Sequence, residues 1–264
     1  VCDFEEGDRV FATIKTGAMA QVIAVDSAQV WRAPKDVHLS RCASIGRNYI
    51  AAYHALKVVG EVTAGNLVMI DGASGGVGLA AVQLAKAMGT RVIAGVSVKD
   101  KCEYPLAAGA DRVLCYGRED DAHRQFKEDA RSAAKELGYP LGAHLVIDMV
   151  QGDLFDSLVS LVGPLGRIAL VGFTGGQRPI RPGLLLIKQA AIIGSNWGAW
   201  AAVYPARHRI NVQEIVALIE SGAARPRADR LFRLSDFAQA FALFENNEGR
   251  GNTVINMAGQ SCGA

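Results

Sequence analysis

The sequence predicts an α/β protein with a doubly wound, parallel, six-stranded sheet and a second, β-rich part that is incomplete. Two observations predict this fold class. From about residue 66 onward, short apolar runs alternate with helical stretches, the pattern of parallel strands joined by crossover helices. A glycine-rich turn follows the first apolar run, at the position where such sheets bind ligands.

Six apolar runs predict the strands of this sheet. They cover residues 67–71, 91–96, 112–115, 144–149, 167–171 and 190–194. Residues 77–88 place apolar side chains at the spacing of a helix that packs on a sheet, and Gly89 is expected to end that helix. Residues 119–137 predict a helix with charges over most of its surface, so we expect it to face solvent.

The segments on either side of the sheet predict the β-rich part. Short strands are expected at 7–11, 19–25 and 253–257, helices at 43–56 and 235–245, and a further packing segment at 227–234. We expect the segments after residue 222 to pack back on those near the start of the sequence.

Composition favours a globular protein with a small-molecule partner. Half of the 264 residues are hydrophobic and 20% are charged, which is enough to bury a substantial core. The formal net charge of +2 gives no broad basic surface for nucleic acid. No apolar run reaches the roughly 18 residues of a membrane-spanning helix, and the acidic start does not resemble a signal peptide. We therefore expect a cytoplasmic protein that binds neither nucleic acid nor membranes.

The cysteines and histidines lack the spacing of metal ligands. The five cysteines are Cys2, Cys42, Cys102, Cys115 and Cys262, without a C-x-x-C pair, so we expect reduced thiols. The five histidines are equally dispersed, and His54 is expected to be a packing residue of a helix. The sequence predicts no metal site.

The most informative segment is 67–78, LVMIDGASGGVG, where an apolar run leads through a glycine-rich turn into a helix. In the G-x-G-x-x-G frame of Rossmann domains, the three positions are Ala73, Gly75 and Gly78. Small residues let backbone N–H groups approach a pyrophosphate, and the start of the helix adds a favourable dipole. Gly78 lets the helix lie close to the strand. The segment therefore predicts a dinucleotide site on a Rossmann sheet.

The same turn also satisfies G-x-S-x-G, the nucleophile elbow of α/β-hydrolases, through Gly72, Ser74 and Gly76. An elbow follows several strands and needs an acid and a histidine behind it. Here the turn follows the first strand of the sheet, and Asp148 with His208 is the one tolerable pairing. The context favours the dinucleotide site.

The end of the second predicted strand favours NADPH over NADH. An NAD site places Asp or Glu there to bind the ribose hydroxyls, whereas residues 92–98, VIAGVSV, contain no acid. Ser97, Lys99 and Lys101 are able to bind a 2′-phosphate. The alternative is that both lysines are ordinary surface charges.

Longer stretches resemble the medium-chain dehydrogenase/reductase superfamily, in its zinc-independent quinone oxidoreductase (zeta-crystallin-like) branch. They are GDRVFA at 7–12, AAYHAL at 51–56, GASGGVGLAAVQLAKAMG at 72–89, AAGAD at 107–111, GRIALVGFTGG at 166–176, LLLIK at 184–188 and IIGSNWGAW at 192–200. The resemblance implies three parts: a partial GroES-like catalytic domain at 1–42, an NADPH-binding Rossmann domain at 43–221, and a C-terminal segment at 222–264 that packs on the first.

The resemblance also implies the residues of the cofactor site, with Ser97 added from the strand-end argument above. The residues implied at the pyrophosphate are Ser74, Gly75, Gly76 and Val77. Those implied at the adenosine 2′-phosphate are Lys101 and Tyr116, and those implied beside the nicotinamide are Gly172, Phe173 and Thr174. Trp197 is implied near the substrate pocket or a dimer edge. Core packing is the alternative for both Phe173 and Trp197.

The sequence departs from this family at both ends. The family's chains begin well before residue 1, so the chain is expected to be N-terminally shortened, without the opening strands of the GroES-like domain. A family lysine in a G-K pair is replaced in Gly251-Asn252. The cysteine-rich lobe of zinc members is absent, and 44–52 contains no cysteine or histidine. We expect cofactor binding to survive these departures better than turnover.

The implied activity is hydride transfer from NADPH to an electrophilic small molecule, either a quinone or a C=C conjugated to a carbonyl (an enone or enoyl group). We identify no catalytic proton donor. Tyr53 and Lys57 match the Y-x-x-x-K pair of short-chain dehydrogenases, but they precede the glycine turn, so we interpret the match as coincidence. The alternative function is NADPH binding with weak or no catalysis. A homodimer is expected through the apolar sixth strand.

Overall fold

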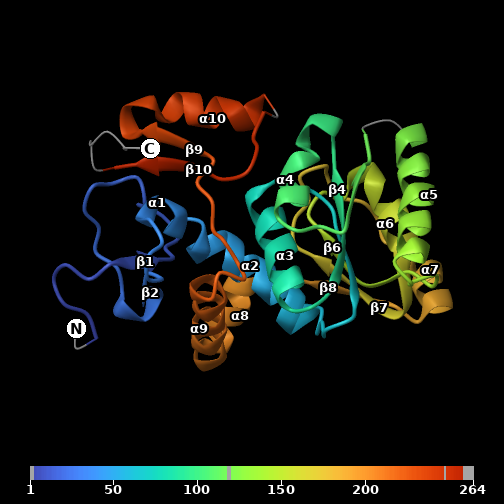
Figure 1. The fold of residues 1–264 in the computed structure, drawn as a ribbon, viewed down its shortest axis with the longest axis horizontal. Coiled ribbons are helices and arrows are strands. Elements are labelled where there is room, and N and C mark those ends of the chain that lie inside the picture. Colours follow the sequence, from blue (N-terminus) through green and yellow to red (C-terminus); the bar gives the residue numbers. More distant parts are fainter. Residues whose placement is uncertain (1–2, 118–119, 247, 258–264) are drawn as a thin grey trace.

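The computed structural model describes residues 3–117, 120–246 and 248–257, and it has two lobes that meet at central helices (Figure 1). One lobe contains a six-stranded sheet flanked by helices. The other contains two small two-stranded sheets, one near each end of the sequence. Among the described helices, none combines the length and the apolar character needed to cross a membrane.

The large sheet is entirely parallel and doubly wound. Its strands are β3 (Leu67–Ile70), β4 (Arg91–Val96), β5 (Arg112–Cys115), β6 (Ala143–Asp148), β7 (Val162–Leu170) and β8 (Ala191–Gly194). Their spatial order is β5-β4-β3-β6-β7-β8, so the chain reverses its direction of travel between β3 and β6. This confirms the predicted fold class and all six predicted strands. In such sheets the crevice for a ligand opens at the carboxyl ends of the two strands where the order reverses.

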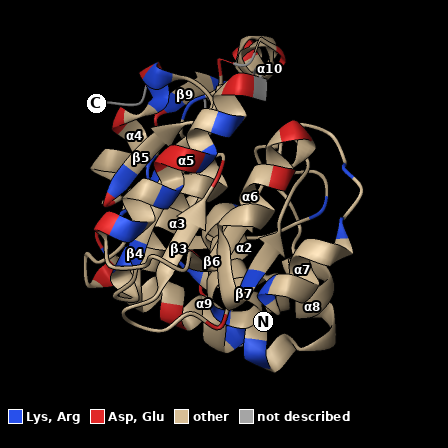
Figure 2. Cartoon of the chain, turned by 90° about the vertical axis from the view of Figure 1, so that its right-hand side faces the viewer, with Lys and Arg blue, Asp and Glu red and all other residues tan. Residues whose placement is uncertain are grey.

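Both faces of the sheet are buried, because side chains alternate between them along each strand. Val68 and Ile70 lie in the cluster beneath α3 (Gly76–Ala87), whereas Leu67 and Met69 lie in the cluster beneath α5 (Asp120–Glu136) and α6 (Phe155–Leu161). From Asp121 onward, the charged residues of α5 are exposed apart from the half-buried Lys127, as predicted for a solvent-facing helix (Figure 2). Residue 119, the first of the helix predicted there, lies outside the described residues.

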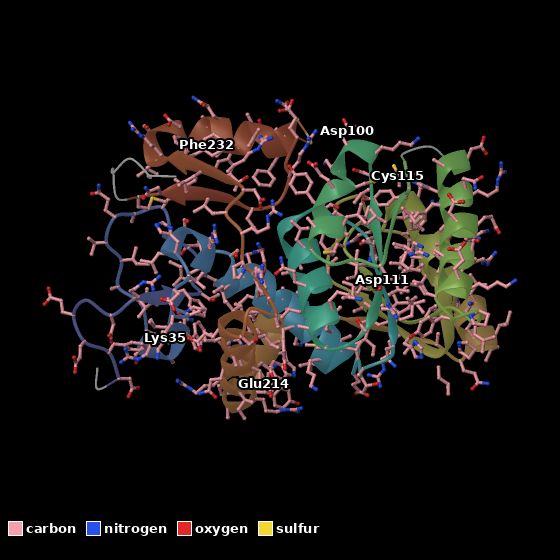
Figure 3. The ribbon with its side chains drawn as sticks, in the orientation of Figure 1. Lys35, Asp100, Asp111, Cys115, Glu214 and Phe232 are labelled. Atoms are coloured by element: carbon pink, nitrogen blue, oxygen red, sulfur yellow. The ribbon has the colours of Figure 1, made fainter. Side chains whose placement is uncertain are left out.

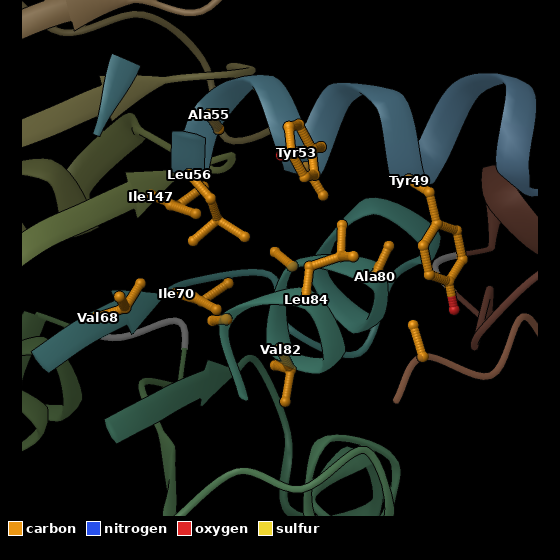
Figure 4. Close-up of a cluster of buried hydrophobic side chains, with 14 of the residues drawn as sticks. Tyr49, Tyr53, Ala55, Leu56, Val68, Ile70, Ala80, Val82, Leu84 and Ile147 are labelled. Atoms are coloured by element: carbon orange, nitrogen blue, oxygen red, sulfur yellow. The ribbon is translucent and has the colours of Figure 1, made fainter. Parts of the chain in front are cut away.

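A long helical stretch covers α3 and extends toward the second lobe. It consists of α1 (Leu39–Cys42), a π-helical segment (Ile45–Tyr49), α2 (Ile50–Tyr53) and a second π-helical segment (His54–Val59). Tyr49, Tyr53 and Leu56 point from it toward Ala80 and Leu84 of α3 (Figure 4). The prediction of a helix at 43–56 is confirmed, and the helical stretch continues beyond it at both ends.

The second lobe contains one strand that the sequence did not predict and lacks one that it did. In it, β1 (Val10–Ala12) pairs antiparallel with β2 (Val30–Arg32). The prediction of a strand at 19–25 is wrong: Val22 is 88% exposed, so the alternation of that segment buries nothing. Instead, Trp31 of β2 stacks on Phe11 with ring centroids 5.7 Å apart, and this contact selects the strand.

The C-terminal segments return to this lobe. Helices α8 (Trp197–Val203) and α9 (Pro205–Glu220) follow β8, and α9 packs on α2 between the lobes (Figure 1). The chain then forms β9 (Arg230–Arg233), α10 (Phe237–Glu245) and β10 (Thr253–Asn256), in which β9 and β10 are parallel. The exact domain boundaries at 42 and 221 stay predictions.

We expect Gly78→Ala to destabilise the protein. A Cβ at Gly78 would lie 2.5 Å from the Gly72 carbonyl oxygen and 2.6 Å from Ala73 Cα, and neither backbone atom can move without displacing β3. The free energy of unfolding, measured by urea titration, should fall by about 1–3 kcal/mol. Gly183→Ala is the control, because nothing lies within 4 Å of a Cβ there. Equal unfolding midpoints for the two variants would contradict the close approach of α3 to β3.

Candidate functional site

The glycine loop connects β3 to α3 at the point where the strand order reverses. Gly75 is extended and precedes α3, whose first turn has neither a capping side chain nor an acidic residue. The nearest atom to a Cβ at Gly75 would be the Gly72 carbonyl oxygen at 3.5 Å, so little crowds this position. With no capping side chain there, N–H groups of the first turn of α3 can donate to an anion, with the helix dipole in support.

A short C-terminal strap, residues 250–252, lies against this loop. The Gly251 N–H donates to the Ser74 carbonyl at 3.0 Å, and Asn48 Nδ2 donates to Asn252 Oδ1 at 2.5 Å. A Cβ at Gly76 would come within 2.5 Å of Asn252 Oδ1, so only glycine fits beneath the strap. Sequence reasoning noted Gly251-Asn252 only as a departure from the family. It missed the contact because Asn48 and Asn252 are 204 residues apart.

The predicted adenosine-phosphate residues gather at the carboxyl edges of β4 and β5. Ser97 follows β4, and Lys101 ends the 3-10 turn Lys99–Lys101, near the labelled Asp100 in Figure 3. Tyr116 follows β5, but its side chain is buried against Phe126, and this burial raises the pKa of the phenol. The structure thus brings Ser97, Lys101 and Tyr116 to one edge while directing the Tyr116 ring inward.

The predicted nicotinamide residues form a turn after β7. The Gly172 N–H donates to the Asp148 carbonyl at 3.3 Å, and both the N–H and the hydroxyl of Thr174 donate to the Met149 carbonyl, at 3.4 and 3.3 Å. An open cavity of about 370 Å³ lies beside this turn, lined among others by Gln151, Gly172 and Phe173.

The two aromatic residues with an alternative interpretation differ in their surroundings. Phe173 is 60% exposed, which contradicts its alternative interpretation as a core aromatic. Trp197 packs against the core beneath α3 and stacks on His208, with ring centroids 6.0 Å apart, so for Trp197 core packing is what the structure shows.

Two buried carboxyl groups lie between the glycine loop and this turn; the sequence did not identify Asp71, and it named Asp148 only as a possible acid partner of Ser74. Asp71 ends the β3 run and is 1% exposed, and Asp148 ends β6 and is 0% exposed. Asp71 accepts hydrogen bonds from the N–H groups of Met149 and Val150, at 2.6 and 3.2 Å. Burial raises the pKa of both carboxyls, and for Asp71 the neighbouring Asp148 adds to the increase. The available signal was an acid at or near the end of each of two predicted strands, 67–71 and 144–149.

The alternative chemistries find no support in this geometry. Tyr53 is buried and donates to Glu214, and burial and that carboxylate raise the pKa of the phenol, opposite to what a catalytic tyrosine needs. Asp148 accepts hydrogen bonds from the loop that follows it, whereas His208 lies between Trp31 and Trp197. Asp148 and His208 therefore do not form a catalytic triad with Ser74.

The histidine and the cysteines behave as packing residues. His54 Nδ1 lies 2.9 Å from Ser195 Oγ, and burial, with a smaller contribution from His208, lowers the pKa of the imidazole to about 4. Cys42, Cys102 and Cys115 are free thiols, while Cys2 and Cys262 lie outside the described residues.

Comparison with known proteins identifies the family. Residues 76–211, more than half of the chain, match the family model described as zinc-binding dehydrogenase. The chain belongs to this family. It is similar to the quinone oxidoreductase-like protein 2 homolog of Nematostella vectensis, with 29% identity over 97% of this chain and 68% of that protein.

Solved structures are similar to the chain as well. A mycobacterial protein complexed with NADPH has a TM-score of 0.86 and 27% identity, over 97% of this chain and 76% of that one. The quinone oxidoreductase of Thermus thermophilus, also studied as its NADPH complex, has a TM-score of 0.79 and 27% identity, over 96% and 78%. The resemblance to the quinone oxidoreductase branch is confirmed. Despite the family's description, the described residues contain no group of three or more His, Cys, Asp or Glu side chains able to hold a metal ion.

We expect Asn252→Ala to release the strap from the glycine loop. The change leaves the Asn48 amide without its acceptor and should cost about 1–3 kcal/mol of unfolding free energy. Hydrogen exchange should accelerate at the Gly251 amide, which donates to Ser74. Asn66→Ala is the control, because Asn66 makes a comparable side-chain bond, to the Thr63 N–H, just before β3, at the opposite edge of the sheet. Faster exchange at Gly251 in both variants would show a general loss of stability instead.

Proposed function

We propose that this chain binds NADPH along the carboxyl edge of the sheet and transfers hydride to a quinone or to a C=C conjugated with a carbonyl. The observation that carries the proposal is the start of α3, which has no capping side chain and follows an uncrowded Gly75 at the point where the strand order reverses. NADPH complexes of two similar family structures support the choice of cofactor.

Each part of the cofactor has residues suited to it. Ser74, Gly75, Gly76 and Val77 would hold the diphosphate through backbone N–H groups, which need no charged side chain. Ser97 and Lys101, with Tyr116 behind them, would meet the 2′-phosphate at the β4 and β5 edge. Gly172, Phe173 and Thr174 would flank the nicotinamide, because their turn borders the open cavity.

The chain's own contribution to the reaction is orientation. NADPH supplies the hydride when bound. The turn at Gly172 and the loop at Gln151 border the space where an acceptor would lie, so they would orient it and exclude water. An acceptor that is already electron-poor needs no metal to polarise it, which is why a quinone or an enone fits this site.

A second candidate is NADPH binding with little or no turnover. One observation favours it: the cavity beside Gly172 is open, and its one ionisable lining residue, Arg178, is paired with Asp153 at 3.1 Å. No described side chain of that lining is thus free to donate a proton. Rapid mixing of the protein with NADPH and a quinone or an enone separates the candidates. Acceptor-dependent loss of NADPH absorbance supports the reductase, and binding without it supports the second candidate.

We expect Lys101→Ala to weaken NADPH binding about tenfold while NADH binding stays unchanged. Losing one lysine contact to an exposed phosphate costs about 1.4 kcal/mol. Fluorescence titration of both cofactors measures the effect. Lys57→Ala removes an exposed lysine from the π-helical segment that follows α2, and it should alter the affinity for neither cofactor. Equal weakening of NADPH and NADH by Lys101→Ala would contradict a 2′-phosphate contact.

Homodimerisation through β8 belongs to the same proposal. This edge strand is only partly covered, and Leu186 and Ile187 of the preceding helix α7 (Pro182–Lys188) are among the most exposed apolar side chains described. An uncovered apolar edge of this kind is commonly paired with another chain. A cytoplasmic location also stays a prediction.

A further inference from the structure

The two buried carboxyls Asp71 and Asp148, here called the acid pair, occupy the ends of the two central strands. Their backbone hydrogen bonds leave one oxygen unused: Asp148 Oδ2 is fully buried and has no donor among the described residues. Two adjacent carboxylates without a buried cation would be strongly unfavourable. One proton between them removes the repulsion and supplies the missing donor.

We propose that Asp71 and Asp148 share one proton and act as positioning residues that hold the two halves of the dinucleotide site together. In this arrangement Asp71 carries the proton and donates to the Asp148 carboxylate. Asp148 Oδ1 meanwhile accepts from the N–H groups of Val150 and Gln151, at 3.2 and 2.8 Å. The inference rests on the proposed function, because the halves are defined by NADPH.

A continuous chain of hydrogen bonds connects the acid pair to both halves. Asp71 directly precedes the glycine loop, where the diphosphate would bind. Its carboxyl group holds the N–H groups of Met149 and Val150. The carbonyls of those two residues in turn accept from Thr174 and Gly175, at 3.4 and 2.8 Å, in the turn beside the nicotinamide. The Val150 N–H and the Met149 carbonyl belong to one peptide group, so a displacement at the acid pair is passed to Thr174 through that group.

The segment after Asp148 also stores backbone strain. Gln151 has φ of 54° and ψ of −129°, a conformation that a residue with a side chain rarely adopts. Its N–H donates to Asp148 Oδ1, and the residue lines the cavity beside Phe173. The acid pair thus keeps a strained residue in place at the wall of the site.

The surroundings isolate the acid pair from other titrations. Tyr116 faces Asp71 from the end of β5, with Cys115 beside it, and burial raises the pKa of that phenol. The end of β4, the loop 149–151, the turn 171–176 and the first turn of α3 contain no titratable side chain.

The shared proton gives the folded state a characteristic pH dependence. The pKa of Asp71 is higher in the folded protein than its ordinary value of 3.8, so the folded state holds a proton that the unfolded state loses. The stabilisation is complete below pH 3.8 and is lost as the pH rises toward the folded pKa. Asp111 is the opposite case: its hydrogen bonds to Lys86, Val92 and Arg91 outweigh burial and lower its pKa.

The first experiment detects the proton directly. Infrared spectra of the wild type, recorded at a series of pH values from 5 to 8, should show the C=O stretch of a protonated carboxylic acid. That band should be absent in Asp71→Asn, whose amide replaces the protonated acid, and present in Asp111→Asn. Asp111 directly precedes β5, at the opposite end of that strand from Cys115 (Figure 3).

The same variants give the folding equilibrium by urea titration. The ratio of the wild-type constant to that of Asp71→Asn should fall by up to about tenfold per pH unit, whereas the ratio for Asp111→Asn stays flat. Absence of the infrared band from the wild type would overturn the shared proton.

The second experiment tests positioning at pH 7.5, with NADPH and with 2′,5′-ADP, which carries the adenosine phosphates but no nicotinamide. Asp71→Asn retains a donor toward Asp148 and should leave both dissociation constants within about twofold. Asp71→Ala removes the acceptor of the Met149 N–H and one of the two acceptors of the Val150 N–H. It should raise the NADPH constant about tenfold while that of 2′,5′-ADP stays within about twofold.

The outcomes separate the two proposals. Equal weakening of both ligands by Asp71→Ala, or of NADPH by Asp71→Asn, would overturn the positioning role. Wild-type protein that binds neither ligand would overturn the proposed function instead. If Asp71→Ala does not fold, hydrogen exchange at the Thr174 and Gly175 amides in Asp71→Asn still tests the positioning role. Those amides should remain as protected from exchange as in the wild type.

Discussion

The close contact between β3 and α3 is the constraint on which the rest of the molecule depends. Gly78 brings the first turn of α3 against Gly72 and Ala73, at a distance that no side chain permits. This contact sets the direction of α3, whose other face receives Tyr49, Tyr53 and Leu56 from the long helical stretch (Figure 4). It also places the first turn of α3, which has no capping side chain, at the point where the strand order reverses. The same close contact therefore determines both how α3 packs and where its first turn lies.

Polar groups do at the carboxyl edge what apolar packing does elsewhere in the sheet. Val68, Ile70 and their neighbours hold the strands together along their length, but a buried carboxyl group directly follows β3 and another ends β6. There the chain uses hydrogen bonds from Asp71 and Asp148 to tie the loop after β6 to the turn after β7. Such a network orders backbone that has no sheet partner, at the edge where a ligand needs a defined surface.

Segments far apart in the sequence complete this edge. The strap at 250–252 reaches the glycine loop from beyond β9 and α10, and Asn252 meets Asn48 from the helical stretch that precedes the sheet. The family comparison places the chain among dehydrogenases but does not account for this amide pair. It stands where the sequence departs from the family's G-K pattern, so the departure has a structural counterpart.

The sequence by itself determined the six strands, the doubly wound order and the glycine loop. Each of these depends on local periodicity, or on residues adjacent in the chain. Only the tertiary structure decided that β2 pairs with β1 while 19–25 remains without a strand, because a contact between Phe11 and Trp31 makes that choice. It alone brought Asp71 to Asp148 and turned Tyr116 inward. The sequence alone does not distinguish a buried aspartate from an exposed one. Their pKa values differ because of neighbouring groups that only folding brings close.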